Sequence, residues 1–256
     1  MIDNLLNTKA TEKIKDLSRF YDEIYYKKYN RLEIMNNPNS SKAKSVFLFI
    51  LDYLEVPFDK KKKLLDVACG GGGLLHFADH RVLTYGVDIS QLSLQYAARI
   101  SPGSVLKKCQ AEKLPFTKEE FDFITCLGSL EHFLDPLKAL KEIKRVLKPK
   151  GKCLIMVPNI FFIFGVFKVG FFGGSPTHHQ KVERFNTLDG WQSLIESGGL
   201  KVIKRRGYNP TFFLKKSDWL KPLRLFGKAG WLLFRNLLPQ GLSYDLLYVT
   251  ERESDD

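Results

Sequence analysis

Four consecutive glycines, Gly70–Gly73, are the part of this sequence best suited to hold a ligand. They follow an apolar run, Leu64–Ala68, that contains the acid Asp66, and they precede a helix-like run, Leu74–Ala78. Strand, glycine turn and helix bind nucleotides in α/β folds, because glycine lets the backbone approach the ligand and the helix N-terminus offers unpaired N–H groups. A second acid, Asp88, ends the next predicted strand, where such sheets bind ribose hydroxyls. The pattern predicts a site for a nucleotide-like molecule.

A second polar pair, Glu131 and His132, follows the predicted strand 121–127. One interpretation is that either side chain takes a proton from a substrate hydroxyl or amine, and the other is that the pair holds the loop in place. No Ser/His/Asp or Cys/His set for nucleophilic catalysis is apparent. Metal binding is not predicted, because the cysteines lack CxxC spacing and histidine partners at zinc-ligand intervals. The cysteines, expected to be reduced core residues, are Cys69, Cys109, Cys126 and Cys153.

The elements that position these residues alternate along the chain. Runs with strand character are 64–68, 85–89, 104–109, 121–127, 153–157, 200–205 and 244–250. Runs with helical spacing are 43–54, 73–79, 91–99, 136–148 and 188–197. Ser90, Asp135 and Thr187 stand where three of these helices should begin. This order predicts a doubly wound α/β fold with a mainly parallel sheet and helices on both faces.

Length and composition allow one sizeable domain, because the 256 residues are 44% hydrophobic. The formal net charge of +12 favours an acidic partner such as nucleic acid, anionic lipid or a phosphorylated substrate. Residues 201–235 carry ten Lys or Arg side chains and one acid, Asp218, so nine of the twelve net charges lie there. Trp219–Leu238 has the pattern of a basic amphipathic helix. Packing on the domain, contact with a membrane or lipid substrate, and contact with nucleic acid stay open, the last being least favoured.

Five motifs, in order between about residues 60 and 160, resemble those of class I S-adenosylmethionine (SAM)-dependent methyltransferases. They are Asp66–Gly72, with Ala68 in place of the first glycine, Gly86–Asp88, Gln110–Phe116, Phe121–Phe133 and Leu147–Lys152. The match is closest to the branch that methylates small molecules, quinones and sugars. A dinucleotide-dependent dehydrogenase would not explain Leu114–Phe116 or the Glu131–His132 pair. The resemblance implies a Rossmann-like seven-stranded sheet with six parallel strands and one antiparallel strand.

The resemblance also implies that SAM is the cofactor. Asp66 would support the amino group of SAM, directly or through water, and Asp88 would accept hydrogen bonds from the ribose hydroxyls. Gln110 would face the adenine amine, and the N–H of Ala111 would face the adenine ring. The full set expected to bind the cofactor is Asp66, Ala68, Cys69, Gly70, Gly72, Asp88, Ile89, Gln110, Ala111, Glu112, Leu127 and Ser129. His132 and Glu131 are the catalytic candidates, since methyl transfer depends on positioning and needs no protein nucleophile.

The acceptor site is expected outside these motifs. We expect residues 1–256 to form a single domain, with a helical cap at 1–58 and acceptor-side insertions at 160–186 and 209–242. The residues expected to bind the acceptor are Tyr29, Phe171, His178 and His179. Some relatives bind a metal with a Glu-x-x-Glu-His set, but Gly128 occupies the first position here, so no metal site is predicted. The expected acceptor is small, apolar or lipid-linked, and methylated on O in preference to N or C.

Two other functions stay open. One is an RNA or protein methyltransferase that uses the basic segment 201–235, and the other is a catalytically degenerate SAM-fold subunit that binds a partner. The intact residues Asp66, Gly70, Gly72 and Asp88 argue against the second. No secretory signal is apparent, and no apolar run reaches the ~20 residues that span a bilayer. We expect a cytoplasmic protein, with peripheral contact to the anionic inner face of the membrane as a further hypothesis.

Overall fold

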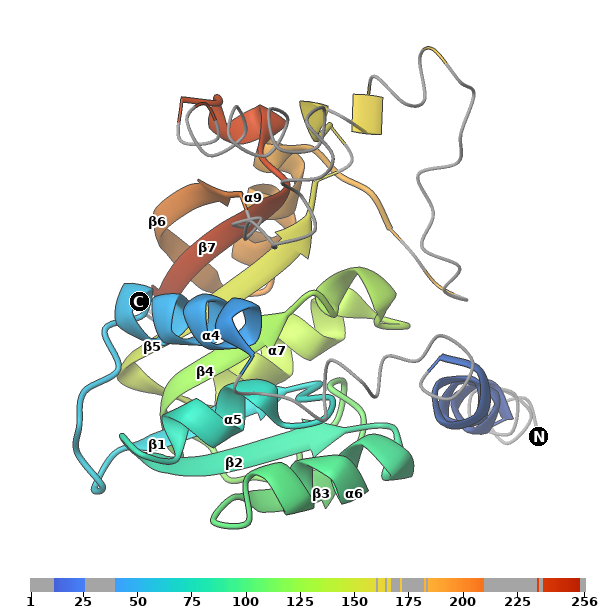
Figure 1. Ribbon diagram of the computed structural model, residues 1–256, viewed down its shortest axis with the longest axis vertical. Helices are drawn as coiled ribbons and strands as arrows, with labels where there is room; N and C mark the ends of the chain where they lie inside the picture. The colour runs from blue at the N-terminus through green and yellow to red at the C-terminus, as the bar shows by residue number, and fades with distance from the viewer. Residues whose placement is uncertain are drawn as a thin grey trace, which may run out of the picture.

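The computed structural model describes residues 12–25, 40–159, 184–209 and 237–253, together with 161–163, 165–166, 171, 182 and 234. Its centre is a seven-stranded sheet in the order β3-β2-β1-β4-β5-β7-β6 (Figure 1). The strands are β1 (Lys63–Val67), β2 (Leu83–Asp88), β3 (Val105–Lys108), β4 (Phe121–Leu127), β5 (Leu147–Pro158), β6 (Leu200–Tyr208) and β7 (Asp245–Arg252). Strand β7 is antiparallel to both β5 and β6, and the other neighbouring pairs are parallel. Six strands therefore share one direction and β7 is reversed, which confirms the predicted sheet.

The burial of each strand follows its position in the sheet. In β1 and β4 every residue except Lys63, Phe123 and Leu127 is buried, as is typical of central parallel strands covered on both faces. The edge strands β3 and β6 are mostly exposed and carry cationic side chains such as Lys108 and Lys204. Charged side chains at a sheet edge oppose pairing with another chain.

Helices cover both faces of the sheet (Figure 1). The helices are α4 (Ser41–Tyr53), α5 (Gly73–Ala78), α6 (Gln91–Ile100), α7 (Pro136–Val146) and α9 (Leu188–Ser197), with short turns η1 (Tyr21–Tyr25), η2 (Leu130–His132) and η4 (Gln240–Leu242). Leu51 of α4 and Leu247 of β7 belong to one buried cluster, whereas Leu140 of α7 and Leu246 of β7 belong to the other. Successive strand residues point to opposite faces, so the two clusters lie on opposite sides of the sheet. The doubly wound α/β fold is confirmed.

The predicted helix starts are confirmed by capping bonds. Each side chain accepts a hydrogen bond from the backbone N–H three residues later: Ser90 at 3.0 Å, Asp135 at 2.9 Å and Thr187 at 3.0 Å. Such a bond satisfies one of the N–H groups that a helix leaves unpaired at its start.

The junction between α7 and β5 differs from the prediction. Helix α7 ends at Val146, and β5 begins at Leu147 instead of Cys153. Leu147 pairs with Phe121, residues 148–151 bulge out of the ladder, and Lys152 resumes the pairing opposite Phe123. A turn predicted from proline and glycine is therefore an irregularity inside a longer strand.

Residues 12–25 form an N-terminal helix that packs against the chain after β2. Ser18 Oγ donates a hydrogen bond to the carbonyl oxygen of Ile89 at 3.0 Å. Asp22 Oδ1 accepts one from Ser90 Oγ. Of the expected N-terminal cap at 1–58, residues 12–25 thus lie beside the end of β2, whereas α4 packs on one face of the sheet. None of the helices in the described ranges is both long and apolar enough to cross a membrane.

Candidate active site

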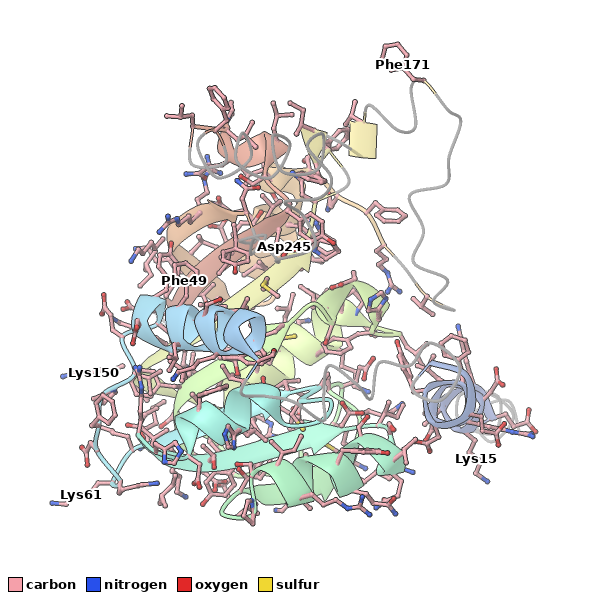
Figure 2. All side chains as sticks on the ribbon, viewed as in Figure 1. Lys15, Phe49, Lys61, Lys150, Phe171 and Asp245 are labelled. Carbon is pink, nitrogen blue, oxygen red and sulfur yellow. The ribbon has the colours of Figure 1, made fainter. Side chains whose placement is uncertain are left out.

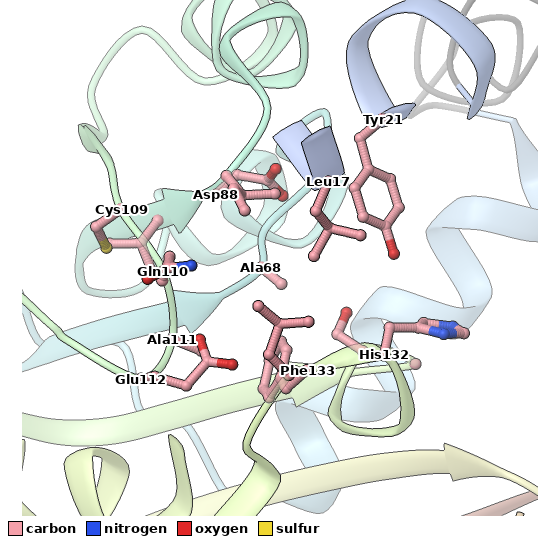
Figure 3. A pocket seen from close by; sticks show the side chains of 15 residues that line it. Leu17, Tyr21, Ala68, Asp88, Cys109, Gln110, Ala111, Glu112, His132 and Phe133 are labelled. Carbon is pink, nitrogen blue, oxygen red and sulfur yellow. The ribbon is translucent and has the colours of Figure 1, made fainter. Parts of the chain in front are cut away.

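A pocket opens beside the N-terminal helix, at the carboxyl ends of β1 to β4, where α/β sheets bind their ligands (Figure 3). The space enclosed between its walls is about 710 Å³, which includes space open to solvent. The lining residues are Leu17, Tyr21, Ala68, Val87, Asp88, Ile89, Cys109, Gln110, Ala111, Glu112, Gly128, Ser129, His132, Phe133 and Leu134.

The glycine turn after β1 forms one wall, and its backbone conformation explains its composition. Ala68, Gly70 and Gly72 have φ angles of 58°, 52° and 78°, the left-handed region that glycine adopts most readily. A Cβ on Gly72 would lie 2.9 Å from the Cα of Ala97 in α6, so this position also requires glycine for space. Ala68 is the residue of this turn that lines the pocket.

Asp88 lines the pocket at the end of β2 and is 6% exposed. Its Oδ2 accepts a hydrogen bond from the N–H of Gly70 at 2.9 Å, and its Oδ1 accepts one from the N–H of Ser90 at 2.8 Å. A carboxylate offers about four acceptor sites, so capacity remains for hydroxyl groups of a ligand. Burial raises the pKa of Asp88 to about 6, although the two N–H groups favour the charged form.

Asp66 of β1 lies behind this wall and is 4% exposed. Its Oδ1 accepts a hydrogen bond from Thr125 Oγ1 of β4 at 2.7 Å. Burial raises the pKa of Asp66 to about 7, the Thr125 bond opposes this rise, and the charge of Asp88 adds to it. Two neighbouring buried acids form an environment that favours a cationic group on the ligand.

The loop after β3 lines the pocket with Gln110, Ala111 and Glu112. Figure 3 shows Gln110 and Glu112 on one side of the pocket, with Tyr21 and His132 on the other. The pocket therefore has two distinct sides, one carried by the loop after β3 and one carried by η2 and the N-terminal helix.

Two residues of α7 hold the loop after β3. Glu142 accepts a hydrogen bond from the N–H of Leu114 at 2.8 Å. Arg145 donates to the carbonyl oxygens of Leu114 at 2.9 Å and Phe116 at 2.8 Å, and it also pairs with Glu142 at 2.7 Å. These supporting residues were not predicted, because the apolar spacing that predicts the helix does not show which segment its polar side chains contact.

Glu131 and His132 form a close pair on η2. Nε2 of His132 lies 3.3 Å from Oε1 of Glu131, and Nδ1 of His132 lies 2.6 Å from the carbonyl oxygen of Val182. A carbonyl oxygen only accepts, so Nδ1 carries a hydrogen, and the contact between Nε2 and Oε1 is favourable when the two atoms share one proton. His132 lines the pocket, whereas Glu131 is 2% exposed. The pair is suited to taking up a proton from a pocket ligand.

The predicted cofactor residues fall into two groups. Those that line the pocket are Ala68, Asp88, Ile89, Gln110, Ala111, Glu112 and Ser129. The remainder, outside the lining, are Asp66, Cys69, Gly70, Gly72 and Leu127. Of the predicted acceptor residues, Phe171 is 72% exposed and away from the pocket, and Tyr29, His178 and His179 lie outside the described residues. Within the described ranges, no three His, Cys, Asp or Glu side chains are grouped to hold a metal ion.

Several lining residues were not predicted. Leu17 and Tyr21 reach the pocket from the N-terminal helix, and Phe133 and Leu134 reach it from the turn after η2. Leu17 and Tyr21 belong to the expected helical cap at 1–58, but no local pattern told which of its side chains line the pocket.

Comparison with known proteins agrees with this architecture. Residues 65–155 match the family described as "Methyltransferase domain". The chain is 33% identical over 175 residues to the ubiquinone biosynthesis O-methyltransferase of Coxiella burnetii, covering 62% of this chain and 74% of that protein. It is 31% identical over 167 residues to the protein of the same name from Pseudomonas fluorescens, covering 58% and 69%.

A solved structure gives the same result for the fold. Phosphoethanolamine N-methyltransferase 2 of Haemonchus contortus, in complex with S-adenosyl-L-methionine, is similar with a TM-score of 0.66 and 18% identity, over 93% of this chain and 60% of that one. The chain belongs to the class I SAM-dependent methyltransferases. It is accordingly a methyl-transferring enzyme with SAM as its cofactor.

Proposed function

We propose that this methyltransferase acts on a hydroxyl oxygen of a small acceptor that is apolar or lipid-linked. The observation that carries the proposal is His132, which lines the pocket on the side away from Gln110 and has its Nε2 3.3 Å from Oε1 of the buried Glu131. The choice of oxygen is supported by the matched relatives, which are named ubiquinone biosynthesis O-methyltransferases. The apolar lining residues Leu17 and Phe133 suit an apolar acceptor.

The residues around the pocket fit SAM. Asp88, with both oxygens already held by backbone N–H groups, would accept hydrogen bonds from the ribose hydroxyls. Gln110 and the N–H of Ala111 would contact the adenine, and the buried acids Asp66 and Asp88 would balance the positive charge of the cofactor. When bound, SAM supplies a methyl group on a positively charged sulfur and requires no nucleophile from the protein.

The His132–Glu131 pair would receive the proton that the acceptor hydroxyl loses. In the deprotonated pair, a lone pair on Nε2 faces the Glu131 carboxylate at 3.3 Å, an arrangement that a proton relieves. The proton is then shared between the two side chains, and the ring keeps its orientation through the Nδ1–H bond to Val182. General base catalysis of this kind contributes about 10²–10⁴-fold to a rate.

The test combines binding with turnover. Calorimetry should show SAM binding, and a radiolabelled-methyl assay should show transfer to a long-chain alkylcatechol, a hydroxylated ring with an apolar tail. His132→Gln should lower kcat about 100-fold or more and leave SAM affinity unchanged. The matched control is His76→Gln, because Nδ1 of His76 also contacts a carbonyl oxygen, that of Ile100 at 2.9 Å, and His76 does not line the pocket.

Each contrary outcome identifies a different alternative. Absence of SAM binding at high micromolar concentration would favour a degenerate binding subunit. Methyl transfer to RNA or protein, and none to the alkylcatechol, would favour the use of the basic segment 201–235 for a macromolecular substrate.

We also propose that the acceptor is taken from an anionic membrane surface. Large apolar side chains are exposed on two segments after β5, and those described are Phe161, Ile163, Val166, Phe171, Phe234, Leu237 and Tyr244. Figure 2 shows Phe171 projecting at the upper end of the molecule. The rings of Phe162 and Tyr244 lie 4.9 Å apart, which brings the two segments together. Exposed apolar side chains beside a basic segment are typical of surfaces that bind anionic lipid.

Flotation with vesicles tests this second proposal. The protein should float with vesicles containing phosphatidylglycerol and remain behind with phosphatidylcholine alone. Reversing Lys221, Arg224 and Lys228 to Glu should abolish flotation, whereas reversing Lys61, Lys118 and Lys150, which are exposed and lie outside the basic segment 201–235 of the sequence, should not. Failure of the unmodified protein to float, or equal loss in both triple variants, would contradict the proposal.

A further inference from the structure

Two residues that precede α9, Val182 and Arg184, contact the turn that carries the His132–Glu131 pair. We call them the strap. They lie 50 residues or more along the chain from the atoms that they contact. They belong to the expected acceptor-side insertion 160–186, so the strap joins that insertion to the proton-accepting side of the pocket.

Arg184 binds the main chain of this turn at several points. Its backbone N–H donates to the carbonyl oxygen of Glu131 at 3.1 Å, and Nη1 donates to the same oxygen at 3.4 Å. Nη1 also donates to the carbonyl oxygen of Phe133, and Nη2 donates to that of Leu134 at 3.0 Å. The last carbonyl groups of a helix lack partners within the helix, and the planar guanidinium with its five N–H donors can serve several of them at once.

Val182 acts on the ring of His132 itself. Its carbonyl oxygen lies 2.6 Å from Nδ1, which requires the hydrogen of the neutral ring to be on Nδ1 and leaves Nε2 to face Glu131. The two residues of the strap thus have different effects. Arg184 holds the backbone from 131 to 134 in place, and Val182 determines the tautomer and the orientation of the His132 ring.

We infer that Arg184 is a positioning residue for the His132–Glu131 pair. The guanidinium holds the backbone of η2 against the strap, and this places Nδ1 of His132 on the Val182 carbonyl oxygen. Without Arg184 the turn and the strap separate, the ring is free to exchange tautomers, and Nε2 no longer has a fixed direction. The role of the pair in methyl transfer rests on the proposed function, but the positioning itself does not.

Nitrogen NMR of the histidine rings tests the positioning without any acceptor. The chain contains five histidines, and the signal of His132 is identified by its loss in His132→Gln. In the unmodified protein, long-range ¹H–¹⁵N correlations should show a hydrogen held on Nδ1 of His132. Arg184→Ala and Arg184→Lys should both replace this signature with averaged tautomers, because lysine keeps the charge but lacks the planar fork. SAM affinity should change less than about threefold, since the residues proposed to bind SAM do not touch Arg184.

Arg205→Lys is the matched control. Its guanidinium contacts Asp189 at 2.7 Å and Gln192 at 3.0 Å on α9, away from the turn, so its substitution should leave the His132 signature intact. Should Arg184→Ala fail to fold, the milder Arg184→Lys decides the question. An unchanged Nδ1–H signature in a folded, SAM-binding Arg184 variant would overturn the inference.

Kinetics separates this inference from the proposed function. With the alkylcatechol as acceptor, Arg184→Lys should lower kcat about 10–100-fold and leave the KM for SAM unchanged, as expected when a proton acceptor is misplaced by about 1 Å. If the NMR signature behaves as expected but the unmodified protein methylates no alkylcatechol, the proposed acceptor is wrong and the positioning role stands. A rise in the KM for SAM by the same factor as the fall in kcat would indicate a general structural role for Arg184 and contradict the inference.

Discussion

The two sides of the pocket are held by different kinds of contact. On the cofactor side, Asp88 accepts from N–H groups that are 18 and 2 residues away along the chain, those of Gly70 and Ser90. On the other side, His132 and its turn are held by Val182 and Arg184, at separations of 50 to 53 residues. Gly70 and Asp88 both lie in predicted motifs, and so do Asp66 and Thr125, whereas Val182 and Arg184 lie in none. The motifs therefore predict both partners of the contacts around the proposed cofactor residues, but they do not predict the residues that hold His132.

The largest difference in stability between the two sides of the pocket is expected for substitutions of two glycines, one on each side. Gly72 and Gly128 both have left-handed φ angles, 78° and 59°. A Cβ on Gly72 would lie 2.9 Å from Ala97, whereas on Gly128 its nearest neighbour would be Oε1 of Glu131 at 4.0 Å. Gly72→Ala should lower the free energy of unfolding by about 2–5 kcal/mol, from backbone strain plus overpacking, and Gly128→Ala by about 1–2 kcal/mol, from strain alone. Urea unfolding measures both, and equal losses would refute the distinction.

Asp88→Asn tests the cofactor side directly. The amide loses the negative charge and turns an NH₂ group toward one of the two backbone N–H donors, Gly70 or Ser90. Hydrogen bonds to charged groups contribute about 1.5–3 kcal/mol each, so SAM affinity should fall about 100-fold. Asp59→Asn is the control, because Asp59 also accepts a hydrogen bond from the backbone N–H two residues later, at 2.9 Å, and does not line the pocket, so the calorimetric Kd should stay unchanged. Similar losses of SAM affinity in both variants would contradict the proposed role of Asp88 in binding SAM.

Thr125→Val tests the hydrogen bond to Asp66, the buried acid behind the glycine turn. The substitution keeps the shape of the side chain but removes the hydrogen bond to buried Asp66, so the free energy of unfolding should fall by about 1–3 kcal/mol. Thr250→Val is the control, because Thr250 is also buried and its hydroxyl donates to the carbonyl oxygen of Cys153 through a longer hydrogen bond, at 3.4 Å. Chemical unfolding should show the smaller loss for Thr250→Val.

The pH dependence of stability should be opposite to that of ordinary ion-paired acids. Burial raises the pKa of Asp66 to about 7 and that of Asp88 to about 6, and burial likewise raises that of Asp245 to about 7. The folded protein then binds protons at a higher pH than the unfolded chain, whose aspartates titrate near ~3.9. SAM-free protein should therefore gain stability as pH falls from about 7.5 to about 5, by about 1 kcal/mol per pH unit for each group in its titration range. SAM affinity should weaken over the same interval, because the cationic ligand favours the charged acids.

Thermal unfolding and calorimetry across this pH range check both trends. Asp122 does not interfere, because hydrogen bonds from Lys148 and the N–H of Lys63 outweigh its burial and lower its pKa, so it titrates below this window. Asp66→Asn and Asp245→Asn should each flatten the stability profile, but only the first should alter SAM affinity. A stability that rises with pH throughout the window would contradict the assignment.

Ala68→Gly should have the smallest effect. Ala68 adopts a left-handed φ of 58°, so glycine relieves strain there, and it also raises the entropy of the unfolded chain by a similar amount. The free energy of unfolding should stay within about 1 kcal/mol of its original value. A much larger change would show that the methyl group of Ala68, which lines the pocket, contributes to packing.

Much of the fold was predictable because its determinants are local. Ser90, Asp135 and Thr187 cap their helices three residues ahead, and such contacts lie within one helical turn. The error at β5 has a different origin, since its extension depends on pairing of Leu147 with Phe121, which no local pattern encodes. The same holds for the site.

The site residues divide in the same way. Asp88 and Gln110 follow strands in order and could be placed at the carboxyl edge from the alternation alone. Tyr21 and Arg184 could not, because their positions depend on contacts with segments that are distant in the sequence. The sequence motifs thus predict residues proposed to bind the methyl donor, but few of the residues proposed to surround the acceptor.

The contacts of Arg184 also bear on how this enzyme can be redesigned. Every one of its described hydrogen bonds ends on a main-chain oxygen, at Glu131, Phe133 or Leu134. A main-chain oxygen is present whatever side chain the residue carries. The side chains of Phe133 and Leu134 can therefore be exchanged to reshape the pocket without removing the points to which the guanidinium is fastened. A library randomised at these two positions should yield variants with altered substrate preference, and the larger losses of stability should fall at Phe133, which also packs against the core.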